Sequence, residues 1–302
     1  MLAFARPLAL ISALAAGAPS ASAAEDLQAL LACLDQRDLT MVSAHRGGPA
    51  PGFPENALET FQRSVDAGIV YLEVDVAQLR DGVLFLMHDS TLDRTTTGSG
   101  SVDAVDWAHI QRLYLKDAGG TVTAFHPPSL KQALRWAGRT GAILKLDVKR
   151  GVDVGRMFRL VEAEAAQDRV LLIAGRPARA RSWAAAAPWA MMSVSVDNAQ
   201  AADTLVQDGF DPARTIAWTG TRQHDPALIE ALDRAGFRVS FGTLGGPDSF
   251  DARIEQSGED SRYVALAAPG LHVIATDRPM AVRAALQAAA RGAAPCTGAA
   301  AP

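Results

Sequence analysis

The sequence has only two cysteines among its 302 residues, and it has no long apolar run. No apolar stretch reaches the roughly 18 residues that a membrane-spanning helix needs, so we expect no transmembrane segment. Lysine and arginine number 29 against 33 aspartates and glutamates, which gives a formal charge of −4. Without an excess of basic residues, the chain lacks the electrostatic signature of nucleic-acid binding. The composition, with 49% hydrophobic and 21% charged residues, is that of a globular protein with a large core.

The first 23 residues differ in character from the rest of the chain. One positive side chain, Arg6, precedes an apolar stretch at 8–16, and the segment ends in an A-x-A cleavage pattern at Ala23. This order is typical of a secretory signal peptide. We therefore expect residues 1–23 to be removed and the mature protein to be periplasmic or secreted, with residues 24–302 forming one domain. The alternative is a disordered alanine-rich leader.

Strand-like and helix-like patterns alternate through the remaining sequence. The strand-like runs lie at 40–45, 70–76, 83–88, 142–148, 170–174, 190–196, 214–218, 237–241 and 271–275. Helical patterns occupy 56–67, 129–139, 155–167, 177–187, 199–208, 225–235 and 279–291. Strands that alternate with helices along a chain form a parallel sheet. So many units in one chain predict an α/β fold, an eight-stranded (β/α) barrel of the TIM type.

Nine strand-like runs are one too many for such a barrel, and the segment 83–88 accounts for the excess. Only Arg80-Asp81-Gly82 separates it from the strand before it. A parallel crossover needs about a dozen residues, whereas Asp-Gly is typical of a hairpin turn. We therefore expect 83–88 to fold back as a hairpin from the second barrel strand. This would bring His88 to roughly 5 Å from the neighbourhood of Asp75.

Polar side chains gather where the predicted barrel strands end, which is the end that carries the active site in α/β barrels. They are His45, Arg46, Glu73, Asp75, Asp147 and Lys149. Residues two apart on a strand point the same way, so Glu73 and Asp75 share a face. Inward-facing carboxylates are costly unless they are paired or bind a metal. Three carboxylates without a nearby cysteine predict a divalent cation, Ca²⁺ or Mg²⁺, rather than zinc.

The basic and histidine residues of this group fit a phosphodiester substrate. Arg46 and Lys149 are the expected contacts of a phosphate group. A phosphodiester needs an acid and a base for its two alcohol groups, and His45 and His88 flank the expected site. The sequence therefore predicts a small-molecule phosphodiester as the substrate.

Five motifs follow one another along the chain: HRGGPAPGFPEN (45–56), LEVDV (72–76), DGVLFLMHDSTLDRTTTGSG (81–100), LKLDVK (144–149) and TDRP (276–279). Together they resemble the glycerophosphodiester phosphodiesterase family, whose barrel is like that of phosphatidylinositol-specific phospholipase C. The resemblance runs from His45 to Pro279. It implies an inserted segment, which fits residues 95–128 here.

The resemblance also implies roles for individual side chains. His45 and His88 would be the acid–base pair. The metal, Ca²⁺ or Mg²⁺, would be bound by Glu73, Asp75 and Asp147. The phosphate would be held by Arg46 and Lys149, with Glu55 lining the site. The reaction would hydrolyse a glycerophosphodiester to sn-glycerol 3-phosphate and an alcohol.

The chain departs from the family pattern at three positions, which are Ala57, Leu79 and Asp147. The family usually has threonine at the first two and glutamate at the third. Asp147 is one methylene shorter than glutamate but keeps an oxygen ligand. Two other functions stay open. One is lysophospholipase D or sphingomyelinase D activity on the same barrel, and the other is a periplasmic protein that binds phosphodiesters without turnover.

The two cysteines stand near opposite ends of the mature chain. Cys33 lies in a helix-like segment just before the first strand, and Cys296 follows the last helix. In a closed barrel the eighth strand neighbours the first, so both cysteines should reach the face opposite the active site. Export to an oxidising compartment permits a disulfide between them. The alanine-rich tail at 292–302 is expected to be flexible.

Overall fold

The structure is a computed structural model, which describes residues 27–297. The expected signal peptide at 1–23 and the last five residues of the alanine-rich tail lie outside the described residues. Between residues 27 and 297, no helix combines the length and the apolar character needed to cross a membrane.

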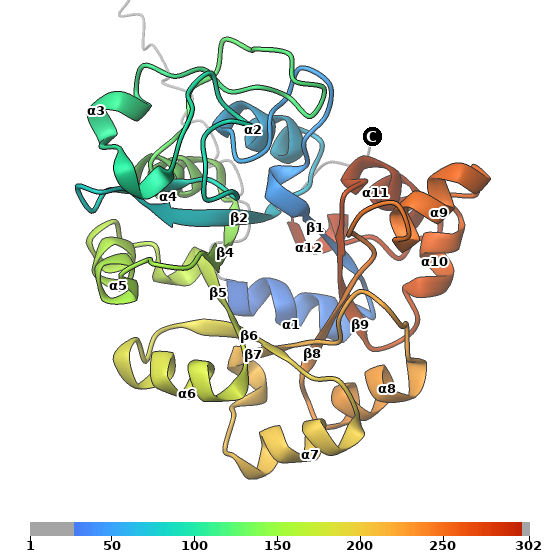
Figure 1. The fold of residues 1–302 in the computed structure, drawn as a ribbon. Coiled ribbons are helices and arrows are strands. Elements are labelled where there is room, and N and C mark those ends of the chain that lie inside the picture. The colour runs from blue at the N-terminus through green and yellow to red at the C-terminus, as the bar shows by residue number, and fades with distance from the viewer. Residues whose placement is uncertain (1–26, 298–302) are drawn as a thin grey trace, which may run out of the picture.

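Eight parallel strands close into a barrel, which confirms the predicted α/β fold of the TIM type (Figure 1). Its strands are β1 (Met41–Ala44), β2 (Tyr71–Gln78), β4 (Ile143–Val148), β5 (Val170–Gly175), β6 (Met191–Ser195), β7 (Thr215–Trp218), β8 (Arg238–Gly242) and β9 (Leu271–Thr276). The barrel strands are paired in chain order, and β1 closes the ring because it pairs with both β2 and β9. The last barrel strand therefore lies beside the first.

A further strand, β3 (Leu84–Leu86), lies outside the barrel and pairs antiparallel with β2, as the hairpin prediction requires. The Asp81 carboxylate accepts a hydrogen bond from the backbone N–H of Val83, and Gly82 has a positive φ of 81°. Glycine adopts such a φ without steric cost. The backbone N–H of Met87 donates to the Asp75 carbonyl at 3.0 Å, so the hairpin brings the chain just before His88 level with Asp75.

Helices surround the barrel (Figure 1). The longer ones are α1 (Leu27–Arg37), α2 (Leu58–Asp66), α4 (Leu130–Thr140), α5 (Val154–Ala163), α6 (Pro177–Ala186), α7 (Ala199–Gln207), α8 (Pro226–Arg234), α9 (Phe250–Ser257) and α11 (Pro279–Ala288). The shorter ones are α3 (Trp107–Ile110), α10 (Arg262–Leu266), α12 (Ala294–Thr297), η1 (His45–Gly47), η2 (Val102–Ala104), η3 (Gln167–Arg169) and η4 (Pro212–Arg214). Local sequence sets several of their starts. Ser129 and Gln132 form a capping box before α4, and prolines occupy the first turns of α6, α8 and α11.

The barrel interior changes from apolar to polar along the strands. The layer nearest the N-terminal ends is apolar, with Met41, Tyr71, Ile143, Leu171, Met191, Ile216 and Val273 in one cluster. Two residues further along the same strands stand Ser43, Glu73, Lys145, Ile173, Ser193, Trp218 and Ala275. Residues two apart on a strand point the same way, so this second layer also faces the interior. Four of these seven side chains are polar or charged, namely Ser43, Glu73, Lys145 and Ser193.

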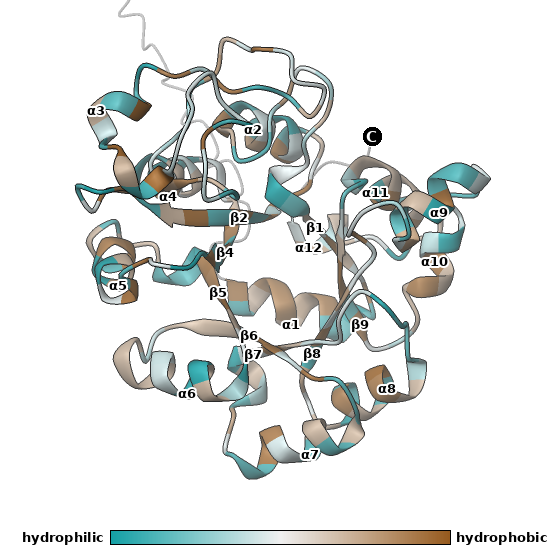
Figure 2. Ribbon diagram, viewed as in Figure 1, coloured by the Kyte–Doolittle hydropathy of each residue, from teal (hydrophilic) through white to brown (hydrophobic). Residues whose placement is uncertain are grey.

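Helix α1 covers the N-terminal end of the barrel. Its leucines 27, 30, 31 and 34 are buried and pack against the apolar layer. Their spacing places them on one face of a helix. Figure 2 shows α1 and the strand segments around it mostly in the hydrophobic colour. The opposite, C-terminal end is the one left open for a polar site.

A disulfide joins Cys33 of α1 to Cys296 of α12, with an S–S distance of 2.00 Å. This is the pairing expected from barrel closure. The described end of the tail forms a short helix at Ala294–Thr297, which the disulfide and the burial of Thr297 hold against the barrel. The expectation of flexibility at 298–302 falls outside the described residues.

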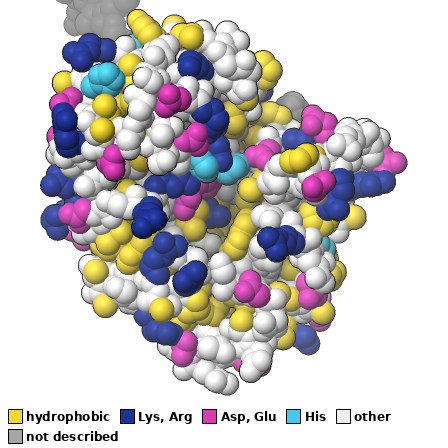
Figure 3. Space-filling model, in the orientation of Figure 1, with side chains coloured by type: hydrophobic (Ala, Val, Ile, Leu, Met, Phe, Trp, Pro, Cys, Tyr) yellow, Lys and Arg dark blue, Asp and Glu magenta, His cyan; other side chains and the backbone are white. Residues whose placement is uncertain are grey.

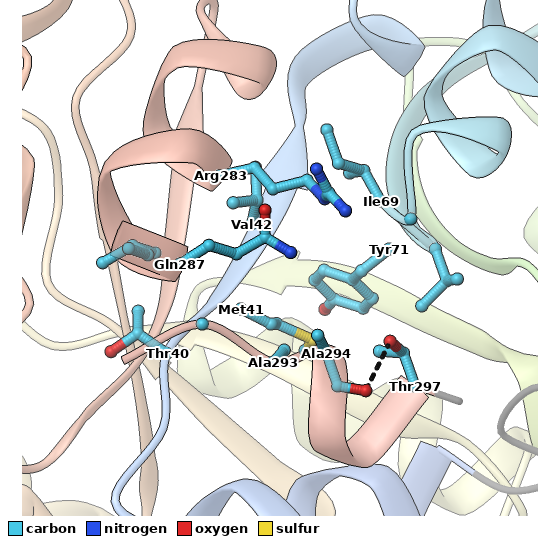
Figure 4. Close-up of a pocket in the computed structure, with 14 residues that line it drawn as sticks. Thr40, Met41, Val42, Ile69, Tyr71, Arg283, Gln287, Ala293, Ala294 and Thr297 are labelled. Carbon is cyan, nitrogen blue, oxygen red and sulfur yellow. Dashed lines mark hydrogen bonds between the residues drawn. The ribbon is translucent and has the colours of Figure 1, made fainter. Parts of the chain in front are cut away.

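A small cavity of about 30 Å³ lies between β1, α11 and α12 (Figure 4). Tyr71, Arg283 and Gln287 lie around it, together with the described end of the tail. Its volume accommodates water and no larger ligand. This cavity is therefore too small for a substrate. A larger one, of about 220 Å³, lies at the same end of the barrel beside Asp35, Asp233 and His272.

The residues between β3 and α4 lie over β2 and carry η2 and α3 (Figure 1). Their apolar side chains make a small core of their own, in which Val102, Ile110 and Leu113 pack with Leu79 and Phe85 from the hairpin. This is the region where the family resemblance places an inserted segment. Leu79, which stands where the family usually has threonine, is buried in that small core.

Candidate active site

The turn after β1 holds His45 and Arg46 in a strained backbone conformation. Arg46 has a φ of 51°, which is uncommon for a residue other than glycine. Gly47 follows with a φ of 84°, and a Cβ there would lie 2.2 Å from Phe61 Cδ1, so only glycine fits. The backbone N–H of Arg46 donates to Glu73 Oε2 at 2.8 Å. The turn is thereby fixed against the carboxylate of the neighbouring strand.

His45 is held by a carboxylate from the far end of the chain. Its Nδ1 lies 2.6 Å from Asp277 Oδ1, just after β9. A carboxylate only accepts hydrogen bonds, so Nδ1 carries the proton and donates it. The other ring nitrogen, Nε2, lies 3.9 Å from Glu73 Oε2. Burial by itself lowers the pKa of His45, but the hydrogen bond to Asp277 and the charge of Glu73 outweigh burial and leave this pKa raised.

Glu73, Asp75 and Asp147 bring their carboxylate oxygens together at the mouth of the barrel, within 4.8 Å of one another. Glu73 is 7% exposed and Asp75 is 1% exposed, while Asp147 is partly buried. Burial, followed by the negative charge of Asp75, raises the pKa of Glu73 to about 7. Three oxygen donors that repel one another suit a hard divalent cation, which would relieve the repulsion. The residues therefore fit the expected metal.

Lys149 lies among these carboxylates. Its Nζ is 2.6 Å from both Asp75 Oδ1 and Asp147 Oδ2. Burial lowers the pKa of Lys149, but the charge of Asp75 and the hydrogen bond to Asp147 outweigh it and leave the pKa raised. The side chain expected to contact phosphate is thus positioned by two of the expected metal ligands.

The loop before α2 supports Asp75 and Arg46. Asn56, with a positive φ of 57°, donates from Nδ2 to Asp75 Oδ2 at 2.7 Å and accepts from the backbone N–H of Asp75 at 3.0 Å. Glu55 accepts from Arg46 Nη1 at 3.0 Å and, in a two-pronged contact, from Arg94 at 2.8 Å. Glu55 therefore organises two arginines beside the carboxylate group.

His88 has the same kind of orientation as His45 but occupies a different cavity. Its Nδ1 lies 2.7 Å from Asp89 Oδ1, so Nδ1 donates and Nε2 is left for chemistry. Arg94 donates to both oxygens of Asp89, and this contact, together with that of His88, lowers the pKa of Asp89. The hairpin argument expected His88 roughly 5 Å from the neighbourhood of Asp75, and the structure gives it the adjacent Asp89 as its carboxylate partner.

Two cavities lie near the carboxylate group, one lined by Glu73 and Asp147 themselves and the other by Lys149, which pairs with Asp75 and Asp147. One, of about 230 Å³, is lined by His45, Glu73, Lys145, Asp147 and side chains from β5, β6 and β7. The other, of about 270 Å³, is lined by His88, Asp89, Lys149, Arg150 and residues of the segment after β3. In the space-filling view, histidine, acidic and basic side chains lie together in the central hollow, with hydrophobic side chains beside them (Figure 3). One histidine thus lines each cavity.

A second group of potential ligands, Asp35, Asp233 and His272, lies at the other end of the barrel. The Nδ1 atom of His272 accepts a hydrogen bond from the backbone N–H of Val239 at 3.2 Å. The proton of the neutral ring is therefore on Nε2, which faces Asp35. That nitrogen has no free lone pair for a metal ion, so this group is better described as a structural contact.

Four contributing residues were not singled out from the sequence, namely Asn56, Asp89, Arg94 and Asp277. Each lies inside a motif from which other residues were chosen as candidates. The motif marks the region as functional but does not show which side chain each of these residues contacts. Asp277, for example, follows the last strand, and only closure of the barrel sets it beside His45. The side chains of Asp89 and Arg94 act through Glu55 and His88, and spacing alone does not reveal such contacts.

The closed barrel carries three carboxylates and two carboxylate-held histidines, so the chain is an α/β-barrel protein with a polar site at the C-terminal mouth. Residues 45–280 match the model of the Glycerophosphoryl diester phosphodiesterase family, and the chain belongs to this family.

Curated relatives match over part of the chain. A glycerophosphodiester phosphodiesterase from Caldanaerobacter subterraneus subsp. tengcongensis is 32% identical over 37% of this chain and 46% of its own length. Glycerophosphodiester phosphodiesterase 1 from Mus musculus is 33% identical over 41% of this chain and 38% of its own length. The matched region thus spans less than half the length of either relative.

Solved structures match over most of the chain. A glycerophosphoryl diester phosphodiesterase from Parabacteroides distasonis is 27% identical with a TM-score of 0.76, covering 88% of this chain and 94% of its own. An Oleispira antarctica phosphodiesterase, solved in complex with the product sn-glycerol-3-phosphate, is 21% identical with a TM-score of 0.67, covering 84% of this chain and 99% of its own. At this identity the second likeness concerns the fold alone.

Proposed function

We propose that this protein is an exported, metal-dependent phosphodiesterase that hydrolyses glycerophosphodiesters to sn-glycerol 3-phosphate and an alcohol. The observation that carries the proposal is the 2.6 Å contact of His45 Nδ1 with Asp277, which leaves Nε2 facing the group of three carboxylates. Family membership supports the substrate class. The product named in the Oleispira antarctica complex is the one expected from this reaction.

Positive charge lies where the phosphate would bind. Arg46 and Lys149 both adjoin Asp75, at 3.8 Å and 2.6 Å. A guanidinium and an ammonium in a partly buried site stabilise the negative charge that builds up on phosphate oxygens in the transition state. A bound Ca²⁺ or Mg²⁺ ion, held by Glu73, Asp75 and Asp147, would supply further charge stabilisation to the same oxygens.

The two histidines supply the proton transfers. We assign His45, held by Asp277, to accept the proton of the attacking hydroxyl, which comes from water or from the glycerol 2-hydroxyl of the substrate. His88, held by Asp89, would donate a proton to the departing alkoxide. Both use Nε2, because Nδ1 of each ring already donates to its carboxylate. After this step His45 carries an additional proton and His88 has lost one. If the glycerol 2-hydroxyl attacks, hydrolysis of the cyclic phosphate with the two roles reversed restores both histidines. If water attacks, proton exchange with solvent restores them.

The direct test uses the purified protein and follows release of glycerol 3-phosphate from glycerophosphocholine and glycerophosphoglycerol, and release of choline from lysophosphatidylcholine. We expect turnover of at least one glycerophosphodiester, its loss after treatment with EDTA, and its return on addition of Ca²⁺ or Mg²⁺. Full activity in excess EDTA after extensive dialysis would remove the metal from the proposal. Binding without turnover would favour a phosphodiester-binding protein. Release of choline from lysophosphatidylcholine alone would favour lysophospholipase D activity.

The variant Glu73→Gln separates metal binding from folding. It keeps the shape of the side chain while removing a charged ligand, and it also relieves the repulsion with Asp75. We expect turnover to fall to the level of the EDTA-treated protein, with a melting temperature equal to or above that of the wild type. The variant Glu230→Gln is the matched control, since Glu230 lies on the exposed face of α8.

A further inference from the structure

Asp251, the second residue of α9, is a buried carboxylate that lines neither of the two cavities beside the carboxylate group. It is 3% exposed. Its Oδ1 accepts a hydrogen bond from the Tyr263 hydroxyl at 2.7 Å, and both oxygens accept from the Thr276 hydroxyl at 2.9 Å. Its Oδ2 also accepts from the backbone N–H of Asp277 at 2.7 Å. Burying a carboxylate is costly unless its oxygens are hydrogen-bonded, and these donors meet that need.

The contact with Asp277 fixes the turn between β9 and α11. Thr276 is the last residue of β9, and Pro279 is the first of α11. The backbone N–H of Asp277 donates to Asp251. The backbone N–H of Arg278 donates to Thr276 Oγ1 at 2.9 Å, and this hydroxyl in turn donates to Asp251. Both amide groups of the turn therefore depend on Asp251, one directly and the other through Thr276.

The segment that carries Asp251 also holds the side chain of Asp277. The Oδ2 atom of Asp277 accepts from the backbone N–H of Gly245 at 3.2 Å, while Oδ1 accepts from His45. Gly245 lies between β8 and α9, where the backbone N–H of Asp251 donates to the Thr243 carbonyl at 2.9 Å. One segment thus contacts the carboxylate of Asp277 through Gly245 and its backbone through Asp251. The orientation of Asp277 toward His45 therefore depends on this segment.

We propose that Asp251 is a positioning residue for the phosphodiesterase reaction, which holds Asp277 so that the His45 ring presents Nε2 to the attacking hydroxyl. This inference rests on the proposed function, in which His45 accepts a proton. A general base must lie within hydrogen-bond reach of the proton that it takes, so a small displacement of the ring lowers the rate. Figure 1 shows α9 and α10, which supply Asp251 and Tyr263, beside α11 on the outside of the barrel. These two helices would thus support the site from behind.

The first test measures kcat and KM for glycerophosphoglycerol at saturating metal. Asp251→Ala removes the acceptor of the Asp277 N–H and should lower kcat by roughly 10- to 100-fold. KM should stay near the wild-type value, because the lost alignment acts in the transition state rather than in substrate binding. Asp248→Ala, at an exposed position of the same segment, is the control and should match the wild type. If Asp251→Ala does not fold, Asp251→Ser takes its place, since a serine hydroxyl is too short to reach the Asp277 N–H.

A double variant separates positioning from a general structural role. If Asp251 acts through His45, the double variant Asp251→Ala/His45→Ala should have the same kcat as His45→Ala alone. A further fall in kcat as large as that of the single Asp251 variant would show that Asp251 supports the site in general. Unchanged kcat in Asp251→Ala, with or without a raised KM, would show that it does not align the base. Each of these results would overturn the proposal.

A second readout needs no turnover. The Nδ1 proton of His45, held by the Asp277 carboxylate, should give a downfield proton NMR signal that is missing from His45→Ala. This signal should weaken or disappear in Asp251→Ala and persist in Asp248→Ala. An unchanged signal in Asp251→Ala would overturn the positioning role. Absence of turnover by the wild type would instead defeat the proposed function, so the two failures are distinguishable.

Discussion

Helix α1 and seven apolar strand residues fill the N-terminal end of the barrel, whereas the C-terminal ends of the same strands carry carboxylates, lysines and a histidine. On β2, for instance, Tyr71 belongs to the apolar layer and Asp75, four residues on, is paired with Lys149. The first end is held by burial, a disulfide and peripheral ion pairs such as that of Arg238 with Asp35, and the second by charge pairs within the carboxylate group. The comparison suggests that stability and chemistry are separable along each strand, and the predictions below test that separation.

The largest expected effect concerns the C-terminal end. His45→Ala and His88→Ala should each lower kcat by roughly 10²- to 10⁴-fold, the range for a positioned acid or base, with melting temperatures close to the wild type. The His88 variant should recover on a nitrophenyl diester, whose leaving group needs no proton. His109→Ala, outside both cavities, is the control. Equal losses of both variants on both substrates would argue against separate acid and base roles.

The second-largest expected effect concerns the N-terminal end of the barrel. Leu31→Ala removes a fully buried side chain of α1 and should lower the free energy of unfolding by roughly 2–5 kcal/mol, because it leaves a cavity in the apolar layer. The kcat of the folded protein should stay near the wild-type value. Denaturant unfolding and steady-state kinetics check both parts. Gln36→Ala, on the exposed face of the same helix, should change neither. A large loss of kcat in Leu31→Ala would show that the two ends are coupled.

Removal of the disulfide at the N-terminal end of the barrel should cause a similar or smaller loss of stability. The double variant Cys33→Ala/Cys296→Ala should lose roughly 2–4 kcal/mol of stability, since the link joins residues 263 positions apart and restricts the unfolded chain. Its melting temperature should fall while kcat at room temperature is retained. Thiol titration of the unfolded, non-reduced protein provides the direct check, and two reactive thiols in that sample would contradict the bridge.

The smallest expected effect is a shift in the pH dependence of the reaction rate. The Asp277 carboxylate favours the charged imidazolium of His45 and so contributes to its raised pKa. Asp277→Asn removes that charge, so the pKa of His45 falls and the limb of the pH–rate profile that His45 carries moves to lower pH. NMR titration of His45 checks the direction. A profile that stays in place or moves to higher pH would mean that Asp277 does not control this histidine. Asp225→Asn, at the cap of α8, is the control.

Much of the fold followed from periodicity and turn chemistry. The eight barrel strands and the β2–β3 hairpin were predicted, since each depends on a short local pattern and on the minimum length of a parallel crossover. Helices α9 and α10, between β8 and β9, were not predicted. Both are short, and α9 buries only Asp251 and Ile254, so its apolar periodicity is weak. The short helix α12 was not predicted, because its four residues are too few to show a periodic pattern.

The sequence by itself determined which residue types stand at the ends of the strands, because alternation within a strand and a polar residue at its C-terminal end are local properties. Only the tertiary structure decided how they pair. His45 reaches Asp277, 232 positions away, because β1 and β9 close the ring, and Lys149 turns to Asp75 because β2 and β4 are in register there. Such contacts depend on barrel closure and strand register, which no local pattern of side chains specifies.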